Sequence, residues 1–417
     1  MKKIFFSSIF VLFCSSFLTA QEFIINAEMR PRFENRHGFK TLINLEEEGA
    51  SFISQRSRIG LDFHKEKLSL GISLQNIRVW GDVYTMATDD KAFAFHQAWA
   101  NYQFSEKFSL KIGRQEILYD DSRIFGNVDW AQQARSFDAI VAKFKFHKNG
   151  ILDIGYSLNN DSEQLINSLY SNIAGYKTFQ YAWYHNNFQY YGFSLLSLNN
   201  GVEYLNSDDQ EELSYSQTIG GRVTFKKNKV AFDSAIYFQT GNLLASTVSA
   251  HYFGGNLFYQ ISDNYNIGIG TEYLSGKDMN DASNTVKSFN PLYGTNHKFN
   301  GLMDYFYVGN HLNSVGLLDL NTPIAYSKNK FSAKITPHFF SSAAAIYEAN
   351  SKQDDYLGTE IDLVLGYHLS KEIFIDGGFS KMYGTHSLEI LKGGDRNENN
   401  SWAWLMVTFK PTLFASK

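Results

Sequence analysis

The sequence predicts an all-β protein: a closed, antiparallel transmembrane β-barrel of about 18 strands, with short periplasmic turns and long extracellular loops. Three observations lead to this prediction. The chain opens with an export signal, it alternates apolar and polar residues over long runs, and its connections alternate between short and long. Aromatic residues make up 16% of the chain although the mean hydropathy is −0.29, as is typical of strands with one lipid-facing and one water-facing side.

Residues 1–20 are predicted to be a signal peptide. Lys2 and Lys3 precede a mostly apolar stretch that ends at Ala20, the kind of small residue that a signal peptidase requires. A membrane anchor is the alternative, but the stretch is short and rich in serine for a spanning helix. The single cysteine, Cys14, lies inside this segment. Residues 21–417, predicted to be one barrel domain, therefore have no thiol or disulfide chemistry.

Period-2 alternation of apolar and polar residues recurs along the whole mature chain. It is clear at residues 52–64, 68–75, 218–225 and 360–367. Many runs cover about 11–14 residues, which is enough to cross a bilayer at a tilt and longer than the about 5–6 residues of globular strands. After the signal, no apolar run reaches the roughly 18 residues of a helical span.

Prolines interrupt some of these runs. Pro31, Pro323 and Pro337 are expected at bulges or strand ends, because a proline cannot donate a hydrogen bond to a sheet ladder. The final strand is predicted at 402–411, with Phe409 or Phe414 as its closing aromatic residue.

The connections separate into two kinds. Short turns are predicted at 64–67, 105–107, 147–150, 186–187, 226–229, 262–264, 327–330 and 370–372. Long loops are predicted at 36–51, 79–91, 119–135, 159–175, 199–213, 277–312, 344–355 and 386–399, with one short loop near 242–246. The resulting hairpins give about 18 strands, and an even number is what a closed bacterial barrel requires.

Basic residues are concentrated in the first third of the chain, where nine of the eleven arginines precede residue 136. Arg30 with Arg32, and Arg56 with Arg58, are spaced two apart, so each pair shares one face of its strand. A charge on the lipid face costs ~2–4 kcal/mol at the midplane, so these side chains are expected to face the lumen. The predicted pore-lining set is Arg30, Arg32, Arg56, Arg58, Lys111, Arg114, Arg123, Arg135, Lys143 and Arg222.

This basic set has two interpretations, and the sequence leaves both open. A basic wall lowers the barrier for anions in a water-filled pore, and arginine binds carboxylates with two parallel hydrogen bonds. Alternatively, acidic residues of the same region pair with the arginines and brace the wall. The candidate acids are Glu28, Glu34, Asp62, Glu116 and Asp138.

Two loops are candidates for solute contact. Residues 120–135 combine amides, arginines and aromatic residues, the side chains that bind sugars by stacking and hydrogen bonding. Residues 290–306 are apolar for a solvated loop and are expected to pack over or into the barrel mouth. Folded inward, such a loop would set the constriction; as an external cap it would make no solute contact.

The motifs of enzymes and cofactor proteins are not found in the sequence. None of the 11 histidines, including His96, lies in a nucleophile elbow or a zinc-binding spacing, and no Walker or GxGxxG pattern occurs. We therefore expect no enzyme activity, no cofactor and no nucleic-acid partner. The acidic run at 208–212 could bind calcium, but it lacks a defined ligand spacing and is better explained as a solvated loop.

Several segments, taken together over essentially the whole mature chain, resemble the alginate-export family of outer-membrane porins in the form common in Bacteroidota. They are AEMRPRFE at 27–34, SQRSR at 54–58, LQNIRVWGD at 74–82, HQAW at 96–99, GRQE at 113–116, the 123–135 loop and the 293–306 segment.

The resemblance implies a monomeric barrel of about 18 strands in a Gram-negative outer membrane, with an arginine-lined constriction for an anionic, alginate-like polysaccharide. It implies pore-lining roles for Arg30, Arg32, Arg56, Arg58 and Arg114, and outer-membrane lipid and the assembly machinery as partners. Three features depart from the family pattern: no long periplasmic turn can act as a plug, acidic residues accompany the arginines, and the sequence ends Phe414-Ala415-Ser416-Lys417 where an aromatic residue is common. The alternatives are a general diffusion porin without polyanion preference and a barrel enzyme acting on lipid or glycan.

Overall fold

A computed structural model of the chain describes residues 21–90, 92–146, 149–170 and 175–416. The predicted signal peptide at 1–20, with Cys14, lies outside these residues. The wall strands are β1 (Glu22–His37), β2 (Ala50–Lys65), β3 (Leu68–Val79), β4 (Phe93–Ser105), β5 (Phe108–Gln115), β6 (Phe137–Phe146), β7 (Gly150–Leu158), β8 (Thr178–Asn187), β9 (Tyr191–Leu205), β10 (Glu211–Lys227), β11 (Val230–Leu243), β13 (Ala250–Gln260), β14 (Tyr265–Leu274), β16 (Leu317–Asn321), β17 (Ile324–Lys328), β18 (Phe331–Ser341), β21 (Tyr356–His368), β22 (Ile373–Gly384), β23 (Ser401–Phe409) and β24 (Thr412–Ala415).

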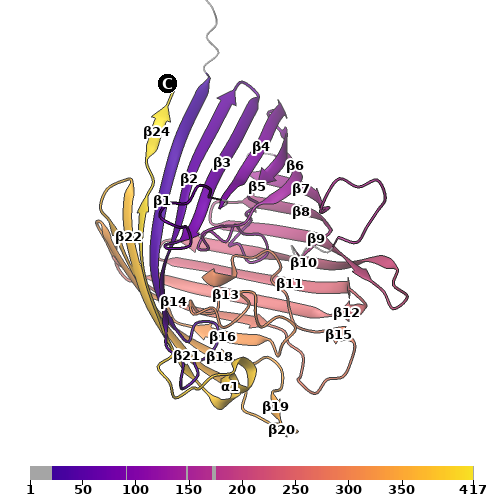
Figure 1. The fold of residues 1–417 in the computed structure, drawn as a ribbon, viewed down its shortest axis with the longest axis vertical. Coiled ribbons are helices and arrows are strands. Elements are labelled where there is room, and N and C mark those ends of the chain that lie inside the picture. Colours follow the sequence, from indigo (N-terminus) through magenta and orange to yellow (C-terminus); the bar gives the residue numbers. More distant parts are fainter. Residues whose placement is uncertain (1–20, 91, 147–148, 171–174, 417) are drawn as a thin grey trace, which may run out of the picture.

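These strands form a closed antiparallel barrel (Figure 1), which confirms the predicted fold. Each strand pairs with its chain neighbours, and β1 closes the ring by pairing with β2 on one side and with β23 and β24 on the other. The wall has 18 strands when β16 and β17, and likewise β23 and β24, are counted as one strand each. Both ends of the described chain lie at the short-turn end of the barrel (Figure 1).

The remaining elements are short and lie in the loops. They are β12 (Ser246–Val248), β15 (Thr285–Val286), β19 (Tyr347–Glu348), β20 (Ser351–Lys352), the 3-10 helix η1 (Asn296–Lys298) and the helix α1 (His386–Lys392). No helix within the described part of the chain is long and apolar enough to span a membrane.

Most predicted connections agree with the structure, but two do not. The long loop expected at 199–213 is only 206–210, because β9 and β10 pair up to Leu205 and Glu211. Asn199 and Asn200, at the start of the predicted loop, both pair within the ladder. Similarly, β8 runs to Asn187, so its turn lies at 188–190 instead of 186–187.

The prolines mark interruptions in the hydrogen-bond ladder. Pro323 separates β16 from β17, as expected for a strand end. Pro337 lies inside β18 opposite this break, and its carbonyl accepts a hydrogen bond from the Thr322 amide at 3.1 Å. Pro31 lies inside β1, where the pairing with β23 is interrupted. The final strand extends beyond the predicted 402–411, because β24 continues the edge after the break between β23 and β24.

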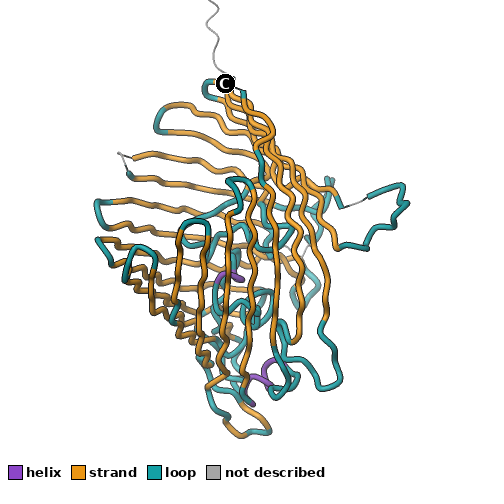
Figure 2. The backbone as a smooth tube through the Cα atoms, turned by 90° about the vertical axis from the view of Figure 1, so that its left-hand side faces the viewer, coloured by secondary structure: helices purple, strands orange, loops and turns teal. Residues whose placement is uncertain are grey.

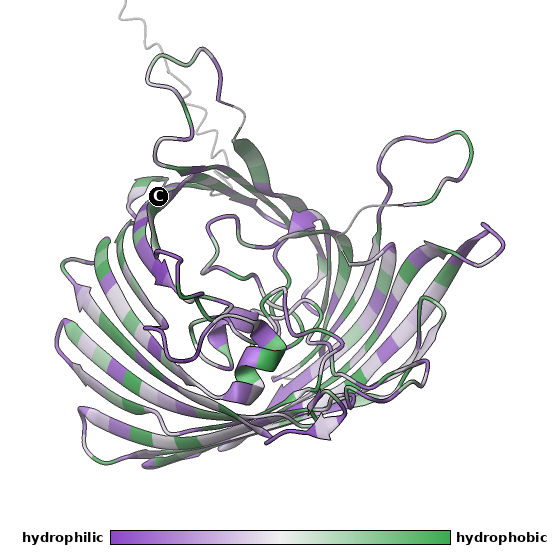
Figure 3. Ribbon diagram, turned by 60° about the horizontal axis from the view of Figure 1, so that its bottom comes forward, coloured by the Kyte–Doolittle hydropathy of each residue, from purple (hydrophilic) through white to green (hydrophobic). Residues whose placement is uncertain are grey.

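The two faces of the wall differ in the way that the alternation predicted. Apolar side chains alternate with polar ones along each strand (Figure 3), and outward residues such as Ile59 are more than half exposed. Near the turns, the rings of Phe104, Phe108 and Phe144 stack across β4, β5 and β6 with centroids 5.2 and 4.9 Å apart. Aromatic residues at the end of a barrel mark the membrane interface.

The core of this protein lies inside the barrel. Loop 3 (residues 116–136) and loop 7 (residues 275–316) fold into the ring of strands, and their backbones pass through it in Figures 2 and 3. Phe125 of loop 3 and Tyr293 of loop 7 are buried with their ring centroids 5.5 Å apart, and Phe179 of β8 packs against both. Loop 7 therefore packs into the barrel and is not an external cap.

Candidate functional site

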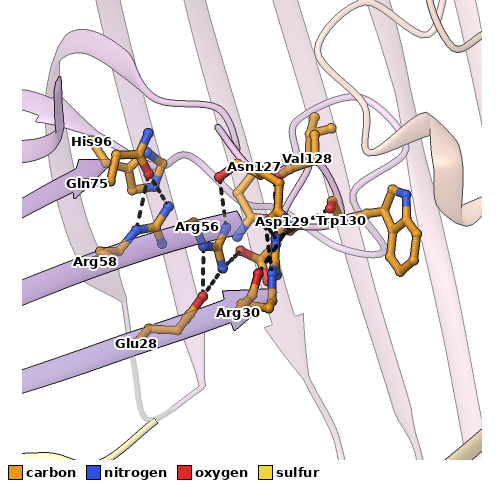
Figure 4. Close-up of polar contacts among 12 residues, drawn as sticks. Glu28, Arg30, Arg56, Arg58, Gln75, His96, Asn127, Val128, Asp129 and Trp130 are labelled. Carbon is orange, nitrogen blue, oxygen red and sulfur yellow. Dashed lines mark hydrogen bonds and ion pairs between the residues drawn. The ribbon is translucent and has the colours of Figure 1, made fainter. Parts of the chain in front are cut away.

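Two arginines of the predicted pore-lining set hold the tip of loop 3. Arg30 of β1 and Arg56 of β2 both point toward Asp129 (Figure 4), with Nη–Oδ distances of 3.3 and 2.9 Å. Arg30 also donates to the Asp129 carbonyl oxygen at 2.8 Å, and Arg56 Nε donates to Glu28 at 2.7 Å. Both guanidinium groups are buried, with Arg30 5% and Arg56 1% exposed. Their hydrogen bonds are made with loop 3 and with β1, so in this conformation they brace the loop.

The charge on Asp129 follows from the same contacts. Burial raises the pKa of the Asp129 carboxyl group, but the positive charges of Arg56 and Arg30 outweigh burial and hold this pKa below its ordinary value. Asp129 is therefore ionised at neutral pH, and the ion pairs that fix loop 3 are fully formed.

Loops 3 and 7 meet at Trp130. The guanidinium carbon of Arg32 lies 4.0 Å from the Trp130 ring centroid, and Arg32 donates to the Trp130 carbonyl oxygen at 2.6 Å. His297 of loop 7 stacks on the same indole at 4.6 Å, while Trp402 and Trp404 of β23 meet it edge-on. The two loops and the closing strand thus share one aromatic cluster.

Three further predicted residues link the two loops to each other and to the wall. Arg123 of loop 3 is 1% exposed and reaches Glu272 of β14 at 2.8 Å and the Asn300 side chain of loop 7 at 3.0 Å. Arg135 donates to a loop 7 carbonyl oxygen at 3.1 Å. Arg222 of β10 lies between two carboxylates, 3.3 Å from Asp233 and 3.4 Å from Asp121.

Arg58 and the predicted lysines face more open space. Arg58 is half-buried and donates to the Gln75 side chain at 2.7 Å. The Lys111 ammonium lies 3.9 Å from the Trp99 ring centroid, and Lys143 pairs with Asp153 of β7 at 2.6 Å. Among the described residues, no carboxylate oxygen lies within 4.0 Å of a charged nitrogen of Arg58 or Lys111.

Arg114 does not lie where we expected it. Lys111 and Gln115 face the lumen from β5, so Arg114 shares the outer face with Ile112, which is 46% exposed. There it pairs at 2.8 Å with Asp138 of β6, and both side chains are exposed. The predicted lumen positions of Arg114 and Asp138 are therefore wrong. Lys111 and Arg114 are three residues apart, and residues at odd spacing lie on opposite faces of a strand.

Sequence reasoning missed a group of lumen carboxylates on β21 and β16, beyond β22 and β23 as seen from the arginine strand β1. Glu360 and Asp362 of β21 accept hydrogen bonds from the backbone amides of Met303 at 2.8 Å and Leu302 at 3.2 Å in loop 7. Further round, Asp319 of β16 lies 3.0 Å from the His338 ring. Glu360 and Asp362 have the same two-residue spacing as the arginine pairs, and that spacing could have identified them.

His96 joins the two ends of loop 3. Its Nε2 lies 2.7 Å from a Glu116 carboxylate oxygen, and its Nδ1 lies 3.0 Å from the Ser136 hydroxyl. A row of serine, histidine and carboxylate is the order of a hydrolase triad. Here His96 is 3% exposed, and the row links β4 to loop 3 in the same way as the arginine contacts do.

The acidic run at 208–212 lies at the tip of the β9–β10 hairpin. Glu212 accepts hydrogen bonds from the Tyr204 hydroxyl at 2.6 Å and the Asn206 amide at 2.8 Å. Over the residues that the structure describes, no group of three or more His, Cys, Asp or Glu side chains is arranged to hold a metal ion.

An antiparallel barrel of this size, with an aromatic belt, short turns on one side and long loops folded into a charged lumen, defines an outer-membrane channel of a Gram-negative bacterium. The chain belongs to the alginate export family, whose sequence model matches residues 23–382.

Solved structures with the same fold are outer-membrane porins. The outer membrane protein OpdK from Pseudomonas aeruginosa superposes with a TM-score of 0.62 at 12% identity, over 94% of this chain and 99% of that chain. OccAB4 from Acinetobacter baumannii gives 0.63 at 12% identity, over 95% and 99%. A BenF-like porin from Pseudomonas fluorescens Pf-5 gives 0.61 at 13% identity, over 94% and 99%. No curated protein matches the chain in sequence.

Proposed function

We propose that this outer-membrane channel is a monomeric, passive porin for anionic sugars or an anionic, alginate-like polysaccharide, with no catalytic activity and no cofactor. The observation that carries the proposal is the one-sided distribution of basic residues around the lumen. β1, β2, β5 and β6 direct eight basic side chains inward, namely Arg30, Arg32, Arg36, Arg56, Arg58, Lys111, Lys143 and Lys145.

Besides Glu28 and Glu34 of the basic wall itself, the lumen has a group of carboxylates on strands further round the ring. Asp233, Glu272, Asp319, Glu360 and Asp362 extend from β11, β14, β16 and β21. Parts of the wall with opposite charge set up a field across the pore, and an anion is drawn along the basic side. The membership of the alginate export family supports the same solute class.

Within the basic wall, two groups are best placed to meet a solute. Arg30, Arg32 and Arg56 are occupied by Glu28, Glu34 and loop 3, whereas Arg58 and Lys111 lack a carboxylate partner among the described residues. We therefore assign the solute contacts to Arg58 and Lys111. In this proposal, the arginines that hold loop 3 and the residues that contact the solute are separate subsets of the basic wall.

The test is single-channel recording of the refolded protein in a planar bilayer under a potassium chloride gradient, with uronate oligomers added. We expect an anion-selective reversal potential and block by the oligomers, both weakened by Arg58→Gln with Lys111→Gln. Arg114→Gln removes the same charge from the outer face and is the matched control. A reversal potential at the value for no selectivity, with no block, would leave a general diffusion porin and contradict the proposal.

The alternative of a barrel enzyme is tested by one substitution. Ser136 is the hydroxyl that His96 could activate, so Ser136→Ala would abolish any ester hydrolysis by the refolded protein while leaving conduction in place. We expect no hydrolysis above that of the buffer for either form. A rate that disappears in Ser136→Ala would establish an enzyme.

A further inference from the structure

We propose that a side cavity in the turn-side half of the lumen binds a small aromatic carboxylate; this rests on the proposed passage of anions and adds a second class of anion to the anionic sugars. The cavity has a volume of about 510 Å³ and lies against the lumen faces of β3 to β8, beneath the first residues of loop 3. Small-molecule sites typically enclose roughly 300–1,000 Å³ and are mostly apolar with a few placed polar groups. A polymer would instead need a continuous groove.

Positive charge dominates this cavity. Lys107, Lys111, Lys143 and Lys145 line it, and Asp153 is its one acidic residue. Lys111 and Lys143 extend from the neighbouring strands β5 and β6, with Lys111 opposite Val141 in the register. Because Lys143 is neutralised by Asp153 while Lys111 has only an aromatic ring against it, the cavity keeps an excess of cationic charge for a bound anion.

The ammonium group of Lys111 is held in place by the wall. Trp99 lies flat over Gly71 of β3, where a Cβ atom would come within 2.3 Å of the indole, so only glycine admits this position. The ammonium then lies over the indole at 3.9 Å, an arrangement favoured by the negative face of the ring. A cation that is positioned before binding loses less conformational freedom when it meets a carboxylate.

The remaining lining is polar at Ser69, Asn101, Gln103 and Ser109 and apolar or aromatic at Trp99, Leu118, Tyr119, Phe144, Ile151 and Trp183. Tyr119 stacks on Trp183 at 4.4 Å, and Leu118 and Ile151 complete this side. The polar atoms of the two rings are already used, since the Tyr119 hydroxyl donates to Asp153 at 2.9 Å and Trp183 Nε1 donates to Asp120 at 3.1 Å. The carbon surfaces left facing the cavity suit an apolar ring, and the lysines suit a carboxylate on it.

The experiment is calorimetric titration of the refolded full-length barrel with benzoate, the smallest probe of this class. A hydrogen bond to a charged group contributes enough that losing one weakens binding by about tenfold. We expect saturable binding that weakens about tenfold in Lys111→Gln and in Lys143→Gln and is retained in Lys111→Arg. Lys334→Gln removes a lysine from β18 on the opposite wall and should bind benzoate as the unchanged protein does.

Two further ligands test whether binding requires both the carboxylate and the apolar ring. Benzyl alcohol has the ring without the charge and should not bind, whereas glucuronate has the carboxylate on a hydroxylated ring and should bind more weakly than benzoate. The proposal is overturned by benzoate binding that is absent or indifferent to the lysine substitutions, by binding of benzyl alcohol, or by tighter binding of glucuronate.

Folding and pore selectivity are measured separately. Each variant is first checked for the heat-dependent shift in gel mobility of a folded barrel, so that lost binding is not mistaken for lost structure. The reversal potential in potassium chloride, without benzoate, reports the proposed function alone. Anion selectivity without benzoate binding would contradict only this inference. Lysine-dependent benzoate binding without anion selectivity would contradict only the proposed function.

Discussion

Trp130 of loop 3 stacks on His297 of loop 7, with ring centroids 4.6 Å apart and planes within 16° of parallel. The two residues come from connections that are far apart in the chain, and they meet inside a barrel wall that neither belongs to. Their contact joins two inward-folded loops into one body inside the ring of strands.

We expect Trp130 and His297 to be energetically coupled. Aromatic pairs contribute about 0.5–1.5 kcal/mol beyond the area that they bury. Denaturant unfolding of Trp130→Ala, His297→Ala and the double variant should give a coupling free energy in this range. Strictly additive effects would mean that the loops are held independently.

Arg56→Gln should loosen the tip of loop 3 and make the open channel noisier. The substitution takes away the closer of the two ion pairs to Asp129, 2.9 Å against 3.3 Å for Arg30, together with the contact to Glu28. Single-channel recording should show larger current fluctuations than in Arg114→Gln, which changes the same charge on the outer face. Equal noise in the two variants would show that the arginine brace does not restrain loop 3.

The same tip should be sensitive to strong acid. Because the pKa of Asp129 is lowered in the folded channel, its ion pairs are fully present above the ordinary value of 3.8 and are lost as the pH falls through the lowered pKa. The part of the conductance that depends on Asp129 should therefore be constant from neutral pH to about 5 and change only below the ordinary carboxyl pKa. Asp129→Asn should have at neutral pH the conductance that the unchanged channel has in acid. If the conductance of this variant still changes in acid, a group other than Asp129 causes the change.

Arg123→Met should release loop 7 from the wall. Removing one partner of a buried ion pair costs about 3–5 kcal/mol, because the other charge stays buried without compensation. Here the stranded group is Glu272, which retains contacts with Asn300 and Tyr252. Protease added to outer-membrane vesicles should cut loop 7 faster in Arg123→Met than in Arg114→Gln, and equal rates would contradict this role.

The sequence was sufficient to predict the barrel because strand length, alternation and connection length are local properties. The 52–64 run shows its face pattern without reference to any partner strand. Errors occurred where local polarity was ambiguous, as at Asn199 and Asn200, which pair in β9 although they read as a loop.

The placement of the site residues depended on less local information. The two-residue spacing puts Arg30 and Arg32 on one strand face, and the cost of a charge in lipid indicates the lumen, where both contact loop 3. The contacts of Arg30 and Arg56 with Asp129 depend on how loop 3 folds. Arg30 and its loop partners are about one hundred residues apart in the sequence, and this separation does not indicate the fold of the loop. Arg114 lies on the outer face, and its odd spacing from Lys111 is the sequence feature that indicates this face.

The inward packing of loops 3 and 7 sets an order of events for assembly. Trp130 contacts Trp402, and Glu34 accepts a hydrogen bond from Trp402 across 368 residues, so the interior is complete only when the last strand reaches the first. A barrel inserted with its seam still open would present the unpaired edges of β1 and β23 together with an unfilled, aromatic interior. The closure of the wall and the packing of the interior are thus expected to occur together in one late, cooperative step. Pairing of the C-terminal strand with β1 completes both.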